Sequence, residues 1–317
     1  MSFTYFLRRL LLSIPTIFIV TLIVFILVRL VPGDVVDIII GTQNYLSQEQ
    51  IQKMYEDFGL DKPLFTQYFV WIRSVLSGNL GFSLRSGEDV ADMLLQRLPV
   101  TLELALLSIL FSIILGIPLG IVSATKKNTS IDNVIKVLGL IGLSSPAFWI
   151  GTIFIVLAST FFENFSIFGY VSFLQNPLKN IQIFLLPAFT LGLMIAAQIL
   201  RITRTSMIEA ITQDYVKVAL SKGLKKNEVI FKHAFRNALI PVVTFAGIQL
   251  GFLFGGSIVI ENMFALPGIG RLLLQAVNQR DYPVIQGIIL FIVILIIVLN
   301  LLIDLIYTIV DPRINLE

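Results

Sequence analysis

The 317-residue sequence contains no cysteine, a single histidine and few charged residues. Without cysteine the chain can form neither a disulfide nor a thiolate nucleophile, so both kinds of chemistry are excluded. Only 14% of its residues are charged, whereas a soluble globular domain typically carries about 25%. In their place, 56% of the residues are hydrophobic and the mean hydropathy is +0.90. This composition predicts a polytopic membrane protein, and the net charge of +3 gives no indication of nucleic-acid binding.

Catalytic motifs are absent as well. The sequence has no G-x-x-x-x-G-K-[ST] phosphate loop, and neither H-E-x-x-H nor a Cys/His spacing that indicates a metal site. His233 has no evident orienting partner, so we interpret it as structural or interfacial. Ser144 and Ser145 precede Pro146 without a surrounding G-x-S-x-G, which favours a proline-associated break in a membrane helix over a nucleophile. The chain is therefore predicted to carry no catalytic residue, metal or cofactor of its own.

Six apolar runs reach the roughly 20 residues that a helix needs to cross a bilayer. We expect spans at 9–30, 101–124, 133–160, 183–202, 237–260 and 284–309. The first exceeds the roughly 7–15 apolar residues of a signal-peptide core, and no cleavage site follows it, so we interpret it as an uncleaved span. The predicted fold is an all-α membrane protein with six transmembrane helices.

The distribution of charge predicts the orientation of these spans. Segment 201–236 holds eight Lys or Arg against three Asp or Glu, whereas segment 31–100 holds five against nine. The other basic positions on the side of 201–236 are Arg8, Arg9, Lys126, Lys127 and Arg313. Because cytoplasmic loops carry an excess of Lys and Arg, this side and both termini are predicted to be cytoplasmic.

Three parts follow from this topology: 1–30 with the first span, an extracytoplasmic helical insert at 31–100, and a core at 101–317 that contains the other spans and the loop 201–236. In the insert, Ser47 and Gln50 form a capping box ahead of one helix, and Pro63 opens a second helix with an aromatic side. The insert either covers the membrane surface or contacts an external partner.

The loop 201–236 is long, basic and periodic. Val216, Leu220, Gly223 and Leu224 follow one helical face, and a second apolar cluster begins at Val229. Gly223 between them is suited to turning the chain because glycine tolerates positive φ. A helix–turn–helix with an apolar stripe that lipid does not require predicts a docking surface for a soluble partner.

Polar residues within the spans are costly and are therefore functional candidates. The candidates for a translocation pathway are Gln249, Ser145, Gln198 and Glu103. Gln249 is the strongest, because glycines at 247, 251, 255 and 256 leave room for a lumen beside it. Asn300 and Asp304 share a face of the last span, and for all these residues the alternative is hydrogen bonding between helices. The turn at 261–283, with its Pro-Gly-Ile-Gly centre, is expected to fold back into the membrane mouth.

Several segments carry a family resemblance in their shared order: FLRRLLLSIPTIF, LPVTLELALLS, SSPAFWIG, YVKVALSKGL, HAFRNALIPVVT, ENMFALPGIGRLLLQAVNQRDYPV and NLLIDLIYTIVDPRI. With them the chain resembles the inner-membrane permeases of dipeptide, oligopeptide and nickel ABC importers, in the first-permease (B-type) subfamily, over essentially its whole length. The resemblance implies a type I ABC importer permease fold in a bacterial or archaeal plasma membrane.

The resemblance also implies a coupling helix at about 214–224 that docks on an ATPase. The residues it assigns to coupling are Asp214, Tyr215, Val216, Ala219, Leu220, Lys222, Gly223 and Leu224. This loop departs from the family's Glu-Ala-Ala pattern, since Lys217 and Val218 precede Ala219, but Tyr215, Asn237 and Pro241 fit the peptide-permease variant.

The implied partners are a homologous second (C-type) permease, two ABC ATPases that bind ATP and Mg²⁺, an extracytoplasmic substrate-binding protein and membrane lipid. Peptides are the expected substrate, with nickel chelates, glutathione or oligosaccharides as alternatives. An ion-driven secondary transporter is the alternative class, but it would predict paired midplane charges and broken helices in related halves, which the sequence does not show clearly.

Overall fold

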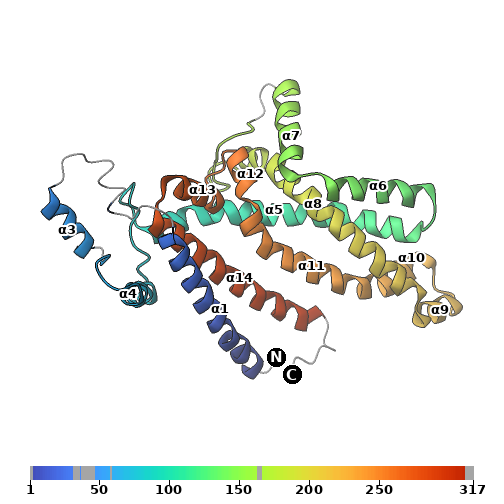
Figure 1. Cartoon of the computed structure of the whole chain (residues 1–317). Helices are drawn as coiled ribbons and strands as arrows, with labels where there is room; N and C mark the ends of the chain where they lie inside the picture. The colour runs from blue at the N-terminus through green and yellow to red at the C-terminus, as the bar shows by residue number, and fades with distance from the viewer. Residues whose placement is uncertain (1–2, 31–35, 37–46, 58, 163–165, 311–317) are drawn as a thin grey trace. The chain divides into compact units, whose positions relative to one another are not determined.

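The computed structural model describes residues 3–30, 36, 47–57, 59–162 and 166–310, and this part of the chain is helical with no strand (Figure 1). The elements are α1 (Phe3–Leu30), α3 (Gln48–Asp57), α4 (Leu64–Leu76), α5 (Val90–Thr125), α6 (Ser130–Ser144), α7 (Ala147–Phe161), α8 (Pro177–Thr212), α9 (Asp214–Ser221), α10 (Lys226–Glu228), the π-helical η1 (Val229–Ala234), α11 (Phe235–Gly256), α12 (Ile258–Met263), α13 (Ile269–Gln279) and α14 (Tyr282–Val310).

Five helices are long and apolar enough to cross a membrane, and the bent pair α6 and α7 makes a sixth candidate. The span expected at 133–160 is a bent pair rather than one continuous helix, because α6 and α7 meet at 101°. The break lies at Ser145 and Pro146, as the sequence predicted. Proline lacks a backbone N–H and forces the preceding residue out of the helical region, and Ser145 is accordingly extended with ψ 125°.

The described residues group into two compact units. Unit 1 is built around Pro99–Arg271 and includes the end of α14 from Val298, whereas unit 2 comprises Phe6–Leu98 and Leu272–Ile297. The predicted boundary at residue 100 thus lies inside α5, close to the point where unit 2 gives way to unit 1.

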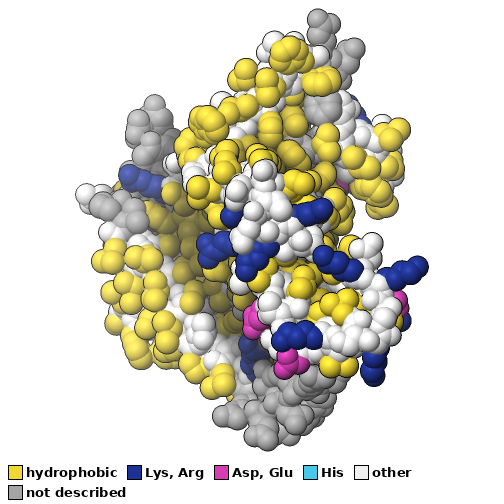
Figure 2. Space-filling model, turned by 90° about the vertical axis from the view of Figure 1, so that its right-hand side faces the viewer, with side chains coloured by type: hydrophobic (Ala, Val, Ile, Leu, Met, Phe, Trp, Pro, Cys, Tyr) yellow, Lys and Arg dark blue, Asp and Glu magenta, His cyan; other side chains and the backbone are white. Residues whose placement is uncertain are grey.

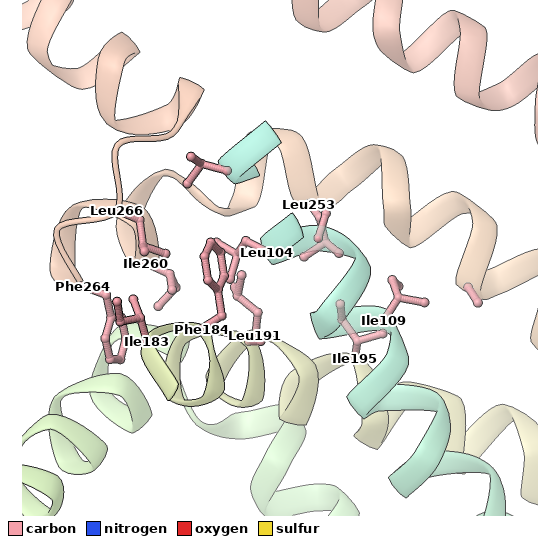
Figure 3. Close-up of a cluster of buried hydrophobic side chains, with 14 of the residues drawn as sticks. Leu104, Ile109, Ile183, Phe184, Leu191, Ile195, Leu253, Ile260, Phe264 and Leu266 are labelled. Carbon is pink, nitrogen blue, oxygen red and sulfur yellow. The ribbon is translucent and has the colours of Figure 1, made fainter. Parts of the chain in front are cut away.

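The core of unit 1 surrounds α8, which packs against α6, α7 and α11. Figure 3 shows side chains from α5, α8, α11 and the α12 region meeting there. The labelled members are Leu104, Ile109, Ile183, Phe184, Leu191, Ile195, Leu253, Ile260, Phe264 and Leu266. All are buried, so α8 is the helix against which the rest of unit 1 is assembled.

Glycines bring α5 and α8 into backbone contact. A Cβ at Gly116 would lie 2.7 Å from the carbonyl oxygen of Ala196, and one at Gly120 would lie 2.6 Å from Cβ of Thr203. On the other helix, a Cβ at Gly192 would lie 2.9 Å from the carbonyl oxygen of Ser108. Small residues allow membrane helices to approach closely, and here they fix the α5–α8 crossing.

The turn after α11 also belongs to unit 1 up to Arg271, and a buried carboxylate organises it. Glu261 accepts hydrogen bonds from Thr101 (2.8 Å), from Ser257 (3.0 Å) and from the backbone N–H of Arg271 (3.0 Å). The expected turn at 261–283 is therefore two short helices, α12 and α13, tied to α5. Its placement at a membrane mouth stays a prediction.

Unit 2 contains the two helices predicted for the insert. The capping box is present, since the N–H of Ser47 donates to Oε1 of Gln50 at 2.8 Å and the N–H of Gln50 donates to Oγ of Ser47 at 3.3 Å. Farther along, the carboxylate of Asp281 accepts from the hydroxyl of Ser83 at 2.5 Å. This bond fastens the loop before α5 to the start of α14.

Candidate coupling surface and cavity

In unit 1, α9 begins at Asp214, where the resemblance places the start of a coupling helix, but the loop expected at 201–236 is shorter than predicted. Residues 201–212 are not loop, because α8 continues through them to Thr212. The chain then turns at Gln213 into α9 and reverses at Gly223, whose φ is +82°. No atom lies within 4 Å of a Cβ built on Gly223, so glycine is required there by the backbone angle rather than by space. Through α10 and η1 the chain returns directly into α11.

The apolar stripe predicted for docking is split by the fold. Val216 and Ala219 are buried and Leu224 is half-buried, whereas Leu220 is exposed. The buried residues pack on a cluster that also contains Met207 of α8 and Val229 of η1. Val216 and Ala219 therefore pack α9 against α8 and η1 of the same chain rather than against a partner. The two apolar clusters that the sequence indicated form one core.

The outer face of α9 is exposed and mixed in character. Tyr215, Val218 and Leu220 are 39%, 51% and 45% exposed. Asp214 and Lys217 form an exposed ion pair at 2.8 Å, and Lys222 is also exposed. Figure 2 looks onto this end of the chain and shows dark blue Lys and Arg side chains beside yellow hydrophobic ones. Such a surface offers apolar and cationic contacts to a partner, and the departure at Lys217 places a cation on it.

A groove of about 590 Å³ with both polar and apolar walls lies beside α9. Its walls come from α8, α9 and α11, and the amide of Asn237 donates to the hydroxyl of Tyr215 at 3.0 Å across it. Pro241 also lines the groove. Three positions of the peptide-permease motif, separated by up to 26 residues in the sequence, thus meet at one place. Glu209 and Ser206 of the same groove were not singled out by the sequence, because nothing local distinguishes them on a long helix.

A buried ion pair joins α6 to the part of α8 that precedes α9. The fully buried carboxylate of Asp132, near the start of α6, receives the guanidinium of Arg204 of α8 in two bonds of 2.9 Å. The hydroxyl of Ser123 donates to it at 2.6 Å and the N–H of Asn128 at 3.0 Å. This network ties α8, shortly before α9, to the α5–α6 turn. In the sequence, Arg204 was distinguishable only as one of the basic residues of segment 201–236.

The two glutamines among the pathway candidates come together. The side-chain amide nitrogen Nε2 of Gln249 on α11 donates to the side-chain oxygen Oε1 of Gln198 on α8 at 3.4 Å. Both line a cavity of about 430 Å³, together with Gly255 and Gly256. No atom lies within 4 Å of a Cβ built on either glycine. Gly255 and Gly256 thus leave open space beside Gln249, whereas a Cβ at Gly247 would lie 2.9 Å from Cγ1 of Ile303.

The other candidates lie elsewhere. Ser145 is half-buried at the α6–α7 break, and Glu103 is half-buried on α5 near Asn180. Neither is among the residues that line the Gln198–Gln249 cavity. Asn300 is exposed, and the side chain of Asp304 lies outside the described part of the structure. Among the described residues, no group of three or more His, Cys, Asp or Glu is placed to hold a metal ion.

Comparison with known families decides what kind of protein carries this arrangement. Residues 116–316 match the family described as the binding-protein-dependent transport system inner membrane component. Residues 2–105 match the N-terminal part of the membrane component of such systems. The chain belongs to this family. The resemblance stated from the sequence is confirmed, and the protein is a multi-pass inner-membrane component of a binding-protein-dependent ABC importer.

Curated relatives match over nearly the whole chain. A putative peptide transport system permease protein of Brucella abortus (strain 2308) is 40% identical over 311 residues, covering 98% of each chain. The dipeptide transport system permease protein DppB of Escherichia coli (strain K12) is 39% identical over 333 residues, again covering 98% of each. The di/tripeptide transport system permease protein DppB of Pseudomonas aeruginosa (strain UCBPP-PA14) is 38% identical over 327 residues, covering 97% of each.

Solved structures support the fold. A chain of the MetNI methionine ABC transporter, crystallised in inward-facing conformations, superposes with a TM-score of 0.58 at 18% identity, covering 69% of this chain and 96% of that one. A second crystal form of the same transporter gives a TM-score of 0.53 at 20% identity, with the same coverage. The predicted type I ABC importer permease fold is confirmed.

Proposed function

We propose that this permease translocates di- or oligopeptides and that α9 is its coupling helix to an ATPase. The observation that carries the proposal is that α8 and α11 both contact α9 and both line the Gln198–Gln249 cavity, so the same two helices connect the two places. The curated relatives are described as peptide, dipeptide and di/tripeptide permeases, which favours peptides over nickel chelates, glutathione or oligosaccharides.

The partners follow from what the chain lacks. Its sequence has no phosphate loop, so ATP and Mg²⁺ belong on two associated ABC ATPases rather than on this chain. A second permease completes the path, and an extracytoplasmic binding protein delivers the substrate. The excess of Lys and Arg in 201–236 supports placing α9 in the cytoplasm, where the ATPases bind.

Movement of α9 reaches the cavity through continuous helix. From Gln198 to the end of α8 at Thr212 a helix spans about 20 Å at 1.5 Å per residue. Because its backbone hydrogen bonds are internal, such a helix transmits displacement without unfolding. Val216 and Ala219 seat α9 on this core, so a shift of the docked ATPases moves α8 and α11 and changes the space between Gln198 and Gln249.

The chemistry of the cavity suits a peptide. A glutamine amide both donates and accepts hydrogen bonds, as a peptide group does. The apolar and glycine lining around the two glutamines leaves the side chains of a passing peptide unselected. This arrangement fits a path that recognises the backbone of the substrate, while the binding protein selects its side chains.

The test places a charge on the exposed face of α9. Val218→Asp adds a carboxylate without disturbing the buried face, and we expect the purified permease to keep its thermal stability but to lose co-purification of the ATPases and peptide uptake. Asn133→Asp places the same charge at an exposed position on α6 and serves as the control. Wild-type ATPase binding and uptake in Val218→Asp would refute the coupling role. Ala219→Asp is unsuitable, because Ala219 is buried and its substitution perturbs folding.

A further inference from the structure

Unit 2 contains an apolar groove of about 400 Å³ between α1 and α4 that the transport mechanism does not use. Tyr68 of α4 crosses onto α1, where its hydroxyl and that of Thr21 lie 2.9 Å apart and its ring meets Phe25 edge-on at 5.3 Å. These contacts hold the two helices together. Beside them, Ile26 on α1 and Phe65 on α4 line the groove, and both are exposed.

The groove lies against a membrane span. Residues Leu11–Leu30 of α1 qualify as a span, and only 17% of its apolar window is buried within the chain. Side chains on the remainder of such a helix contact other membrane components. An apolar groove beside such a span is filled by hydrocarbon more favourably than by water, because water gains few hydrogen bonds from its walls.

One positively charged side chain lies in the apolar groove. Arg29, in the last turn of α1, is the single charged residue that lines the groove. Its Nε donates to Oε1 of Gln67 at 2.9 Å, and its Cζ lies 3.7 Å from the centre of the Phe25 ring. Within the described residues no carboxylate pairs with it. Gln67 and Phe25 thus hold the plane of the guanidinium in place beside the apolar walls of the groove.

We propose that this groove binds one bilayer phospholipid, with an acyl chain between α1 and α4 and the phosphate on Arg29. The end of a span lies at the headgroup level, where long basic side chains direct their charge toward the interface. A guanidinium is the side chain best matched to a phosphate, because it offers two parallel N–H donors. The apolar walls and the cation thus correspond to the two parts of a phospholipid.

The experiment uses the purified permease complex and a phosphatidylglycerol that carries a photoreactive group in its acyl chain. Labelled peptides from α1 and α4 are quantified by mass spectrometry. We expect Arg29→Gln to reduce labelling of these peptides about tenfold, as for loss of one charge-assisted contact. Arg73→Gln, which removes an exposed charge from α4 outside the groove, should leave the labelling unchanged.

A second variant tests the groove without removing the contacts that Arg29 makes to Gln67 and Phe25. Ile26→Trp fills the groove and leaves Arg29 in place, and it should reduce labelling as Arg29→Gln does. Equal labelling of the wild type and both groove variants would overturn the proposal, because it would indicate only the general lipid shell. Cross-linking of a cysteine placed at Phe65 to the second permease would also overturn it, by identifying a protein as the occupant. The absence of any native cysteine makes this last measurement specific.

Discussion

At the residue scale, the Asp132–Arg204 pair is the clearest case of a group that must be kept intact. The carboxylate is fully buried and Arg204 is 21% exposed at its side chain. A buried charge without its partner costs several kcal/mol, whereas an exposed ion pair contributes little. Asp132 accepts four hydrogen bonds, two of them from Arg204. The turn between α5 and α6 therefore depends on Arg204, and so does the position of the last part of α8.

We expect Asp132→Asn to destabilise the permease by about 3 kcal/mol, because it leaves the guanidinium of Arg204 without its counter-charge. The measurement is the thermal unfolding midpoint of the detergent-purified protein. Lys136→Met is the control, since Lys136 is 44% exposed and lies 3.6 Å from the same carboxylate; its effect should stay below about 1 kcal/mol. An unfolding midpoint for Asp132→Asn equal to that of Lys136→Met would contradict the assigned importance of the buried pair.

The same pair marks a limit of sequence reasoning. Gly223 was recognisable because positive φ is a local demand that one residue type satisfies. Asp132 and Arg204 are 72 positions apart, and neither lies in a pattern that names the other. Contacts of this kind depend on which helices become neighbours, so the sequence alone predicted the turn glycine and missed the ion pair.

At the element scale, helical periodicity identified amphipathic segments but not the surface that each apolar face meets. Val216 and Leu220 were assigned to one stripe, yet the first packs on η1 and the second stays exposed. Four residues span slightly more than one helical turn, so the two positions differ in direction by about 40° on the helix surface. The boundary between the buried and the exposed side of α9 runs between these two positions, so Val216 is buried and Leu220 is exposed. The break at Pro146 was predictable, because proline acts locally, whereas the angle of 101° depends on packing.

The α5–α8 crossing gives a prediction at this scale. Gly120→Leu should abolish stable assembly of unit 1, because even a Cβ at this position would lie 2.9 Å from the carbonyl oxygen of Leu200. Gly120→Ala should cost about 1–3 kcal/mol, the usual range for overpacking. Thermal unfolding and the monodispersity of the purified protein are the measurements. Gly255→Ala is the control, since no atom lies within 4 Å of its Cβ position, and it should be close to neutral.

Stable, monodisperse Gly120→Leu protein would show that α5 and α8 are not held at this separation. Gly255→Ala, in contrast, would reveal any general intolerance of the helices to loss of glycine. The pair of variants therefore separates the steric cost of a side chain at the crossing from intrinsic helix propensity, which favours alanine over glycine.

At the scale of the whole molecule, apolar length predicted the number of spans but not their roles. The spans in α1 and α8 both pass the same length and hydropathy test, yet 17% of one apolar window is buried in the chain and 67% of the other. Lipid and a protein interior are similarly apolar, so composition does not distinguish a helix that faces lipid from one at the centre of a core. The positions of the spans along the chain were therefore accessible from the sequence, and the central place of α8 was not.

The arrangement of unit 1 separates two functions along the same helices, and this separation can be measured. Gln249→Leu removes the hydrogen-bonding group from the cavity while keeping a similar volume, far from α9. We expect wild-type co-purification of the ATPases but roughly tenfold slower peptide uptake, because a peptide group in the cavity loses a hydrogen-bonding partner. Val218→Asp should instead lose both ATPase binding and uptake while the cavity is unchanged, so ATPase binding distinguishes the two variants. Loss of ATPase binding in Gln249→Leu would contradict the assignment of coupling to α9. Unaltered uptake would contradict the assignment of the pathway to the Gln198–Gln249 cavity.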